Sequence, residues 1–220
     1  MPHAHTHTSM HEIEQGLARD WVEIVATVLL ALATVASAWS AYQSAAWSGI
    51  ETTKFSSAQA ARTQAAEADE KADSLRAVDT FLFAGYADAY ARGDMRLVEF
   101  YETNLFRDEM IPALDAWKAT NPLTNPEATR NPFEMPEYKL AEDEKARELQ
   151  AKAAEDTREA RSAIKTSDRY ILFTVLFASV LFFAGISTKF RASGIRLAVL
   201  VMGALLFFGT LAAVLLQPMS

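Results

Sequence analysis

The 220-residue chain contains no cysteine and only four histidines, all of them within its first eleven residues. Disulfide bonds, thiolate nucleophiles and cysteine-based metal sites are therefore excluded. A metal centre built from carboxylates in a helical bundle would need Glu-x-x-His pairs, and no histidine follows residue 11. We therefore expect a protein that is not an enzyme and that has no cofactor, and the sequence identifies no small-molecule substrate.

The histidines alternate along the N-terminal segment, a spacing at which imidazole nitrogens can capture a transition metal. The other interpretation, which we favour for residues 1–20, is a flexible polar tail in which they bind nothing specific. Within it, Ile13 and Leu17 are spaced as on a short surface helix over residues 10–20. The weak candidate metal ligands are His3, His5, His7 and His11.

Positive charge is also scarce, with 21 basic residues against 28 acidic ones. Residues 44–169 alone carry 24 acids and 17 bases, a net charge of −7. Binding to nucleic acid requires a basic face that displaces counterions from the phosphates. The composition therefore argues against a nucleic-acid partner.

Charge is nearly absent from three apolar runs, which predict transmembrane helices at residues 21–43, 170–188 and 195–216. A helix needs about 20 apolar residues to cross a bilayer at 1.5 Å per residue. The first run also resembles a signal peptide, with a small-residue cleavage site at Ala36-Ser37-Ala38. Its acidic flank and its length argue against that alternative. Apart from Arg196 at the edge of the third run, the second and third runs lack charged side chains of the kind that mark ion pathways, which argues against a pump or transporter.

The ends of these runs carry aromatic and basic residues, as is typical of the membrane–water interface. The basic link between the second and third runs is short, so it should lie in the cytoplasm. This places the protein in the cell (inner) membrane with a cytoplasmic N-terminus and with residues 44–169 outside the cytoplasm. The expected interface residues are Trp21, Trp39, Tyr42, Trp47, Tyr170, Lys189, Arg191 and Arg196.

Proline is missing from the two alanine-rich stretches that adjoin the first and second runs. In both stretches alanine recurs at alternating spacings of three and four, a heptad pattern with a thin hydrophobic seam. Asp79 occupies one seam position as a charged exception. We expect the two helices to pair antiparallel into a coiled-coil stalk. The predicted seam residues are Ala58, Ala61, Ala65, Ala68, Ala72, Leu75, Ala146, Leu149, Ala153, Ala160 and Ala163.

The segment between the two seams predicts a small head. Arg92-Gly93-Asp94 should end the first helix and cap a new one. Large apolar side chains follow in residues 95–120, where Pro112 should break or kink the helix. Four prolines then make residues 121–136 an irregular loop, after which the helix should resume at Glu137. We expect these side chains to pack inside the head with Phe81, Leu82, Phe83, Tyr86 and Tyr90; the alternative is an exposed partner-binding patch.

The layout resembles a bacterial family of membrane proteins, number 4337 among the domains of unknown function. The residues that carry the resemblance are His11-Glu12 before the first run, Tyr42-Gln43 after it, and the basic link at residues 189–196. The resemblance implies a membrane architecture and no established activity.

The sequence therefore predicts an all-α membrane protein, in which a long antiparallel helical hairpin at residues 44–169 separates the first transmembrane helix from the other two. We expect a helical scaffold or accessory subunit whose partners are the lipid bilayer and either further copies of itself or another membrane protein. The alternative is a subunit of a homo-oligomeric channel or transporter. Its only motivation is a polar edge on the first helix, formed by Ser37, Ser40, Gln43 and Ser44.

Overall fold

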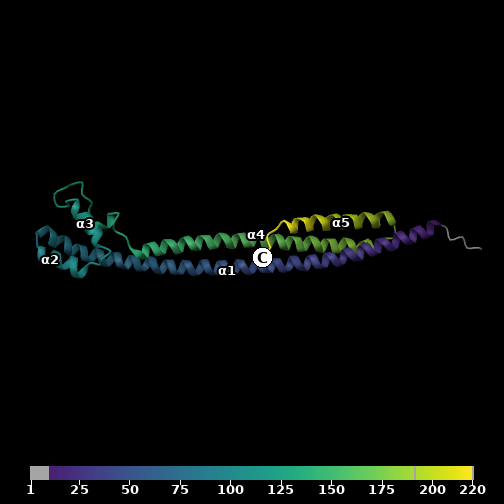
Figure 1. Cartoon of the computed structure of the whole chain (residues 1–220), viewed down its shortest axis with the longest axis horizontal. Helices are drawn as coiled ribbons and strands as arrows, with labels where there is room; N and C mark the ends of the chain where they lie inside the picture. Colours follow the sequence, from purple (N-terminus) through teal and green to yellow (C-terminus); the bar gives the residue numbers. More distant parts are fainter. Residues whose placement is uncertain (1–9, 191, 220) are drawn as a thin grey trace, which may run out of the picture. The chain divides into compact units, whose positions relative to one another are not determined.

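The computed structural model describes residues 10–190 and 192–219, with side chains from residue 21 onward. His3, His5, His7 and Arg191 lie outside the described residues, as does the side chain of His11. Within the described part the protein is all helical, without a strand (Figure 1). Its elements are α1 (Met10–Arg92), α2 (Met95–Phe100), the π-helical turn η1 (Tyr101–Leu105), α3 (Ile111–Ala119), the 3-10 turn η2 (Pro132–Glu134), α4 (Ala141–Ser187) and α5 (Ser193–Leu215).

Helix α1 is much longer than an ordinary helix, with 83 residues. Residues 10–20 belong to it, where the spacing of Ile13 and Leu17 indicated a short surface helix within the expected tail. Helices α1, α4 and α5 each contain a stretch that is long and apolar enough to cross a membrane. The predicted all-helical architecture with three such stretches is therefore confirmed.

The chain divides into two compact units, and α1 and α4 contribute to both. The first unit, here the apolar unit, combines Met1–Lys54 with Arg158–Ser220. The second, here the head unit, is Phe55–Thr157. The division falls about eleven residues inside each end of the expected 44–169 section. The reason is that the last turns of that section pack with the apolar helices.

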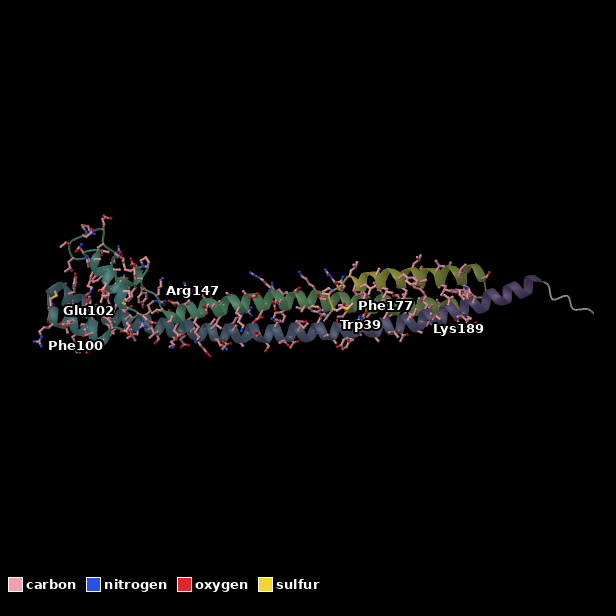
Figure 2. The ribbon with its side chains drawn as sticks, in the orientation of Figure 1. Trp39, Phe100, Glu102, Arg147, Phe177 and Lys189 are labelled. Atoms are coloured by element: carbon pink, nitrogen blue, oxygen red, sulfur yellow. The ribbon has the colours of Figure 1, made fainter. Side chains whose placement is uncertain are left out.

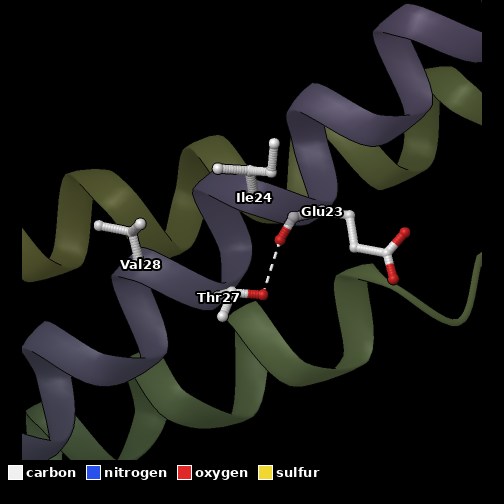
Figure 3. A pocket seen from close by; sticks show the side chains of 4 residues that line it. All are labelled: Glu23, Ile24, Thr27 and Val28. Atoms are coloured by element: carbon white, nitrogen blue, oxygen red, sulfur yellow. Dashed lines mark hydrogen bonds between the residues drawn. The ribbon is translucent and has the colours of Figure 1, made fainter.

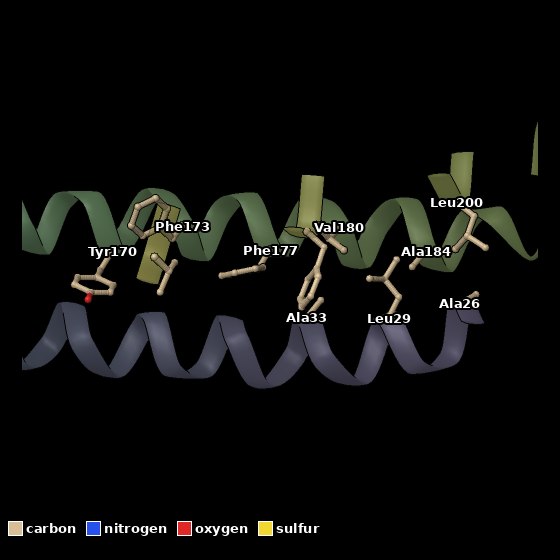
Figure 4. Packing of buried hydrophobic residues seen from close by; sticks show 11 residues of the cluster. Ala26, Leu29, Ala33, Tyr170, Phe173, Phe177, Val180, Ala184 and Leu200 are labelled. Carbon is tan, nitrogen blue, oxygen red and sulfur yellow. The ribbon is translucent and has the colours of Figure 1, made fainter. Parts of the chain in front are cut away.

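The core of the apolar unit is formed by α1, α4 and α5. Figure 4 shows Phe177 and Val180 of α4 directed toward α1, where small residues such as Ala33 leave room for them. Helix α5 adds Leu200 and Phe207 to the same cluster. Gly203 of α5 lies so close to Phe183 that an added β-carbon would be 3.3 Å from the Phe183 Cβ. Small residues therefore allow these helices to approach closely.

In the head unit, the corresponding contact between α1 and α4 is lined by alanine. The seam alanines of both helices are buried, while Leu75 and Leu149 are half-buried. Alanine at these positions lets two helices pack closely with little buried area per residue. The buried seam alanines of the head unit are Ala58, Ala61, Ala65, Ala68, Ala72, Ala146 and Ala153.

Helix α1 ends where the sequence predicts. Gly93 has a φ of +73°, a left-handed conformation that glycine adopts without a steric penalty. The Asp94 side chain then accepts a hydrogen bond from the Leu97 backbone N–H and caps α2. Pro112 lies in the first turn of α3, where its missing N–H is tolerated. The expected break therefore falls before Pro112, in residues 106–110.

The head holds a second core, made of aromatic and apolar side chains from α1, α2, η1, α3 and the proline-rich loop. Tyr86 is completely buried there, and Phe83 packs edge-on against both Trp117 and Phe133. Leu82 and Tyr90 join this cluster as expected. Phe81 does not, because it is 80% exposed.

Helix α4 begins at Ala141, four residues later than expected. The Tyr138 N–H donates to the Met135 carbonyl, so the chain is still turning at this point. The Leu140 carbonyl then accepts from the N–H groups of Asp143 and Glu144 and starts the helix. The acids of the first turn favour this start because they complement the positive end of the helix dipole.

Candidate functional site

Asp79 is the most unusual side chain of the head unit, because it is a carboxylate with 0% exposure on the buried, mainly apolar face of α1. Arg107 forms an ion pair with it, in which Nη2 contacts Oδ2 and Nε donates to Oδ1 at 3.3 Å. The Tyr138 hydroxyl donates to Oδ2 at 2.9 Å. These three residues, here the Asp79 clamp, come from α1, from the segment before α3 and from the segment before α4.

The electrostatics of the clamp favour a structural role. The hydrogen bond to Asp79 raises the pKa of Arg107 above its ordinary value, so the guanidinium stays charged. Burial and the hydrogen bond to Asp79 raise the pKa of the Tyr138 phenol, so it stays protonated at neutral pH. Both oxygens of the carboxylate are thus engaged by donors that keep their protons. The arrangement ties three segments together and does not offer a base for proton transfer.

A second polar cluster lies within the aromatic core. The π-helical turn η1 carries Glu102 (Figure 2), which accepts a hydrogen bond from the Tyr86 hydroxyl at 2.8 Å. Lys118 of α3 donates to the same carboxylate at 2.9 Å and also pairs with Asp115. Burial and Glu102 raise the pKa of Tyr86, which keeps its hydroxyl as a donor. Glu102 therefore links α1 to α3 across the core.

Ionic and polar contacts join α1 to α4 along the alanine seam of the head unit. Arg76 donates to both oxygens of Asp143, at 3.1 and 2.9 Å, and Lys71 pairs with Glu142. The contact with Lys71 lowers the pKa of Glu142. Further along, the Ser57 hydroxyl donates to Asp156 at 2.7 Å. These contacts fix which residues of the two helices face each other.

In the apolar unit the predicted seam residues Ala160 and Ala163 are buried. At the next seam position of α4, a serine takes the place of alanine. Ser167 of α4 lies within hydrogen-bonding distance of the Ser44 and Ser48 hydroxyls, at 3.0 and 3.1 Å. Its hydroxyl also donates to the Ser44 carbonyl at 3.1 Å. The polar edge that motivated a channel is mostly buried here, since Ser40, Gln43 and Ser44 all face the interior.

The residues expected at a membrane interface have different surroundings. Trp21, Trp39 and Tyr42 are exposed on α1, and the rings of Trp39 and Tyr42 lie 5.8 Å apart. Trp47 packs against the core of the apolar unit. The remaining three are Lys189, which is exposed (Figure 2), Arg196, which is 9% exposed, and Tyr170, which is buried and donates to the Pro218 carbonyl.

The surface has two shallow concavities, one in each unit. One is lined by Glu23, Ile24, Thr27 and Val28 of α1, where the Thr27 hydroxyl donates to the Glu23 carbonyl (Figure 3). The other lies in the head unit beside Glu109 and is lined by charged side chains from the start of α4. Among the described residues, no group of three His, Asp or Glu side chains is placed to hold a metal ion.

The sequence did not identify the Asp79 clamp or the role of Glu102. Asp79 was visible only as a charged exception in the heptad. Its partners Arg107 and Tyr138 are 28 and 59 positions away, so no local spacing connects them with it.

Comparison with protein-family models, with curated proteins and with solved structures found no match to this chain.

Proposed function

We propose that this chain is a three-span membrane protein whose head unit serves as a helical scaffold in the assembly of membrane proteins. The observation that carries the proposal is the apolar outer surface of the apolar unit. Large apolar residues such as Val35, Leu205 and Phe208 are 64–70% exposed. Small and hydroxylic residues such as Ser40, Ser187 and Thr210 are buried. Water would disfavour this surface, whereas lipid chains would solvate it.

The paired contacts support an antiparallel stalk between the first and second spans. Residue numbers fall along α4 as they rise along α1: Ser57 meets Asp156, Asp69 meets Gln150, and Arg76 meets Asp143. The proposed arrangement needs no chemistry at the clamp, whose carboxylate is fully engaged. The resemblance to family 4337 of the domains of unknown function is kept as part of the proposal, together with a cytoplasmic N-terminus and an exported head unit.

A channel or transporter subunit is the weaker candidate. The polar residues of α1 that suggested a channel are mostly packed between helices. Among them, Ser44 is hydrogen-bonded to Ser167. Hydroxyl groups in such positions hold membrane helices together. We therefore assign the polar edge to helix packing.

The first test asks whether the exposed apolar face contacts lipid. The full chain is expressed as wild type, as Leu205→Lys and as the matched control Leu205→Ile, and membranes are extracted with alkaline carbonate. We expect the wild type and the control to stay in the membrane pellet. Lysine should reduce insertion, because a charge at the centre of a span costs about 2.5–3.5 kcal/mol. An exposed residue in water would tolerate lysine, so a soluble wild type or an unaffected L205K variant would contradict the proposal.

The second test concerns assembly. Crosslinking in native membranes, followed by gentle detergent extraction and mass analysis, should give a species larger than one chain. A protein that is monomeric under these conditions, and that captures no other membrane protein, would rule out the scaffold function while leaving the membrane assignment intact.

A further inference from the structure

The outer face of α4 carries a strip of positive charge where the helix leads into its apolar stretch. Its basic residues recur at spacings of three and four, which places them on one side of the helix. All of them are exposed. The opposite side of the same turns is buried, as at Ala163 and Tyr170. The members of this strip, here the basic face, are Arg158, Arg161, Lys165 and Arg169.

Little negative charge offsets the basic face within the apolar unit. Glu159 lies on a different side of α4, because a helix turns 100° per residue, and it pairs with Lys54 of α1. Asp168 is the one acid on the basic face itself, so four bases and one acid leave a net charge of +3. Within the described residues, the first three members of the face form no ion pair, and Arg169 donates to the Gln217 side-chain oxygen at 3.0 Å.

The basic face continues directly into the exposed apolar surface of the same helix. Leu172 and Val175 follow Arg169 by three and six positions and are 55% and 56% exposed. Cationic side chains beside a span attract the negative charge of lipid headgroups, while their apolar stems lie along the hydrocarbon boundary. Nucleic acid would match the positive charge, but it would leave the adjoining apolar surface without a partner. Charge and continuity together therefore favour lipid.

The position of each base along α4 determines how near it lies to the headgroups. At 1.5 Å per residue, Lys165 and Arg169 lie within about 8 Å of Tyr170, where the apolar stretch begins. Arg161 lies about 14 Å and Arg158 about 18 Å from it. The polar layer of one leaflet is about 5–8 Å thick, so the first two can contact phosphates directly. The other two act through longer-range attraction, which salt screens over about 8 Å.

We propose that the basic face of α4 binds the headgroups of anionic phospholipids in the leaflet next to Tyr170. Lys165 and Arg169 hold the lipid phosphates through charge-assisted hydrogen bonds. Arg161 and Arg158 add attraction from further out. The inference rests on the proposed crossing of the membrane by α4, and it names a class of lipid and a surface for it. It applies to either orientation of the chain.

The absence of native cysteine allows a fluorescent probe to be attached at one chosen position of the full chain. Leu172→Cys places the probe one turn from the basic face. Ala38→Cys is the matched control, because Ala38 is exposed on α1 at a similar depth, given that Ser44 meets Ser167. Each labelled chain is reconstituted into phosphatidylcholine nanodiscs that contain a small fraction of nitroxide-labelled phosphatidylglycerol or of nitroxide-labelled phosphatidylcholine.

The nitroxide quenches a probe only at short range, so quenching reports which lipid lies beside each position. We expect labelled phosphatidylglycerol to quench the Leu172→Cys probe roughly twofold or more strongly than labelled phosphatidylcholine does. Both lipids should quench the Ala38→Cys probe equally.

Variants of the basic face assign the preference to particular side chains. Lys165→Gln combined with Arg169→Gln should abolish it, because these two bases lie nearest to the phosphates. Arg158→Gln should reduce it much less, and Lys165→Arg, which keeps the charge, should retain it. Salt at about 0.5 M should weaken the preference by screening. In every variant, unchanged quenching of the Ala38→Cys probe by labelled phosphatidylcholine verifies that the chain is still inserted.

Equal quenching of the Leu172→Cys probe by the two lipids would overturn the inference and leave the membrane crossing of α4 standing. A preference that persists in the double variant, or that is as strong at Ala38→Cys, would also overturn it, because the attraction would then not come from the basic face. A chain in which neither lipid quenches either probe is not embedded in the bilayer, and that result would remove the proposed crossing as well.

Discussion

At the scale of single residues, Asp79 is the most informative position in the head unit. A completely buried carboxylate is tolerated only when donors satisfy it, and here a guanidinium and a phenol do so. The cost of desolvating the charge means that the pair need not add net stability over an apolar substitute. Removing one partner is different, because it leaves the other charge without compensation.

We therefore predict that Asp79→Asn destabilises the head unit by about 3 kcal/mol. The free energy of unfolding is measured in urea by the fluorescence of Trp117, with phenylalanine in place of the tryptophans of the apolar unit. Asp73→Asn is the matched control, because Asp73 forms an exposed ion pair with Arg76 and should change stability by less than about 1 kcal/mol. Equal effects of the two substitutions would refute a special role for Asp79.

Tyr138 makes the clamp sensitive to high pH. Its folded-state pKa is raised above the ordinary 10.0. The stability that its protonation contributes is therefore fully present below pH 10 and is lost as the pH rises through the folded pKa. We predict that Tyr138→Phe costs about 2 kcal/mol at pH 8, and that the difference from wild type shrinks above pH 10 by up to about 1.4 kcal/mol per pH unit.

The measurement is urea unfolding of both proteins at a series of pH values from 8 upward. Tyr90→Phe serves as the control, because the Tyr90 hydroxyl forms no hydrogen bond within the described residues and the substitution retains the ring. A stability difference between wild type and Tyr138→Phe that stays constant from pH 8 to pH 12 would show that the phenol does not titrate with folding.

At the scale of elements, the contact between α1 and η1 depends on a glycine. A β-carbon at Gly85 would lie 2.2 Å from the Tyr101 hydroxyl oxygen and 3.0 Å from its Cζ. The turn η1 has π-helical geometry, which is rare and places Tyr101 on α1 while Glu102 reaches Tyr86. Gly85 therefore lowers the helix propensity of α1, but it allows η1 to approach α1 closely.

Gly85→Ala should destabilise the head unit by about 1–3 kcal/mol through overpacking, even though alanine favours the helix by up to about 1 kcal/mol. Adding Tyr101→Phe should recover part of the loss, because it removes the atom nearest to the new methyl group. Gly49→Ala is the matched control, since no atom lies within 4 Å of its added β-carbon. It should be neutral or stabilising. A Gly85→Ala variant as stable as Gly49→Ala would contradict the close contact.

At the scale of the whole molecule, the proposed membrane topology predicts opposite labelling of two exposed sites. Pro126→Cys lies in the loop of the head unit, and Ser193→Cys begins α5. If α4 crosses the membrane between them, a maleimide that cannot cross membranes should label only one of the two in intact cells. With the head unit exported, P126C should be labelled and S193C protected until the cells are lysed.

The reverse pattern would place the head unit in the cytoplasm and would preserve the three spans. Labelling of both sites in intact cells, or of neither, would be incompatible with a single crossing of α4 between them.

The sequence by itself determined the helices, the three apolar stretches, the stop at Gly93 and the apolar head. Each of these depends on local periodicity, a cap or a run of one residue type. Only the tertiary structure decided that Phe81 stays outside the aromatic core and that Asp79 is clamped by Arg107 and Tyr138. The physical reason is that a heptad pattern records which face of a helix is buried. It carries no information about which distant donor satisfies a buried carboxylate, because that depends on where separate segments meet.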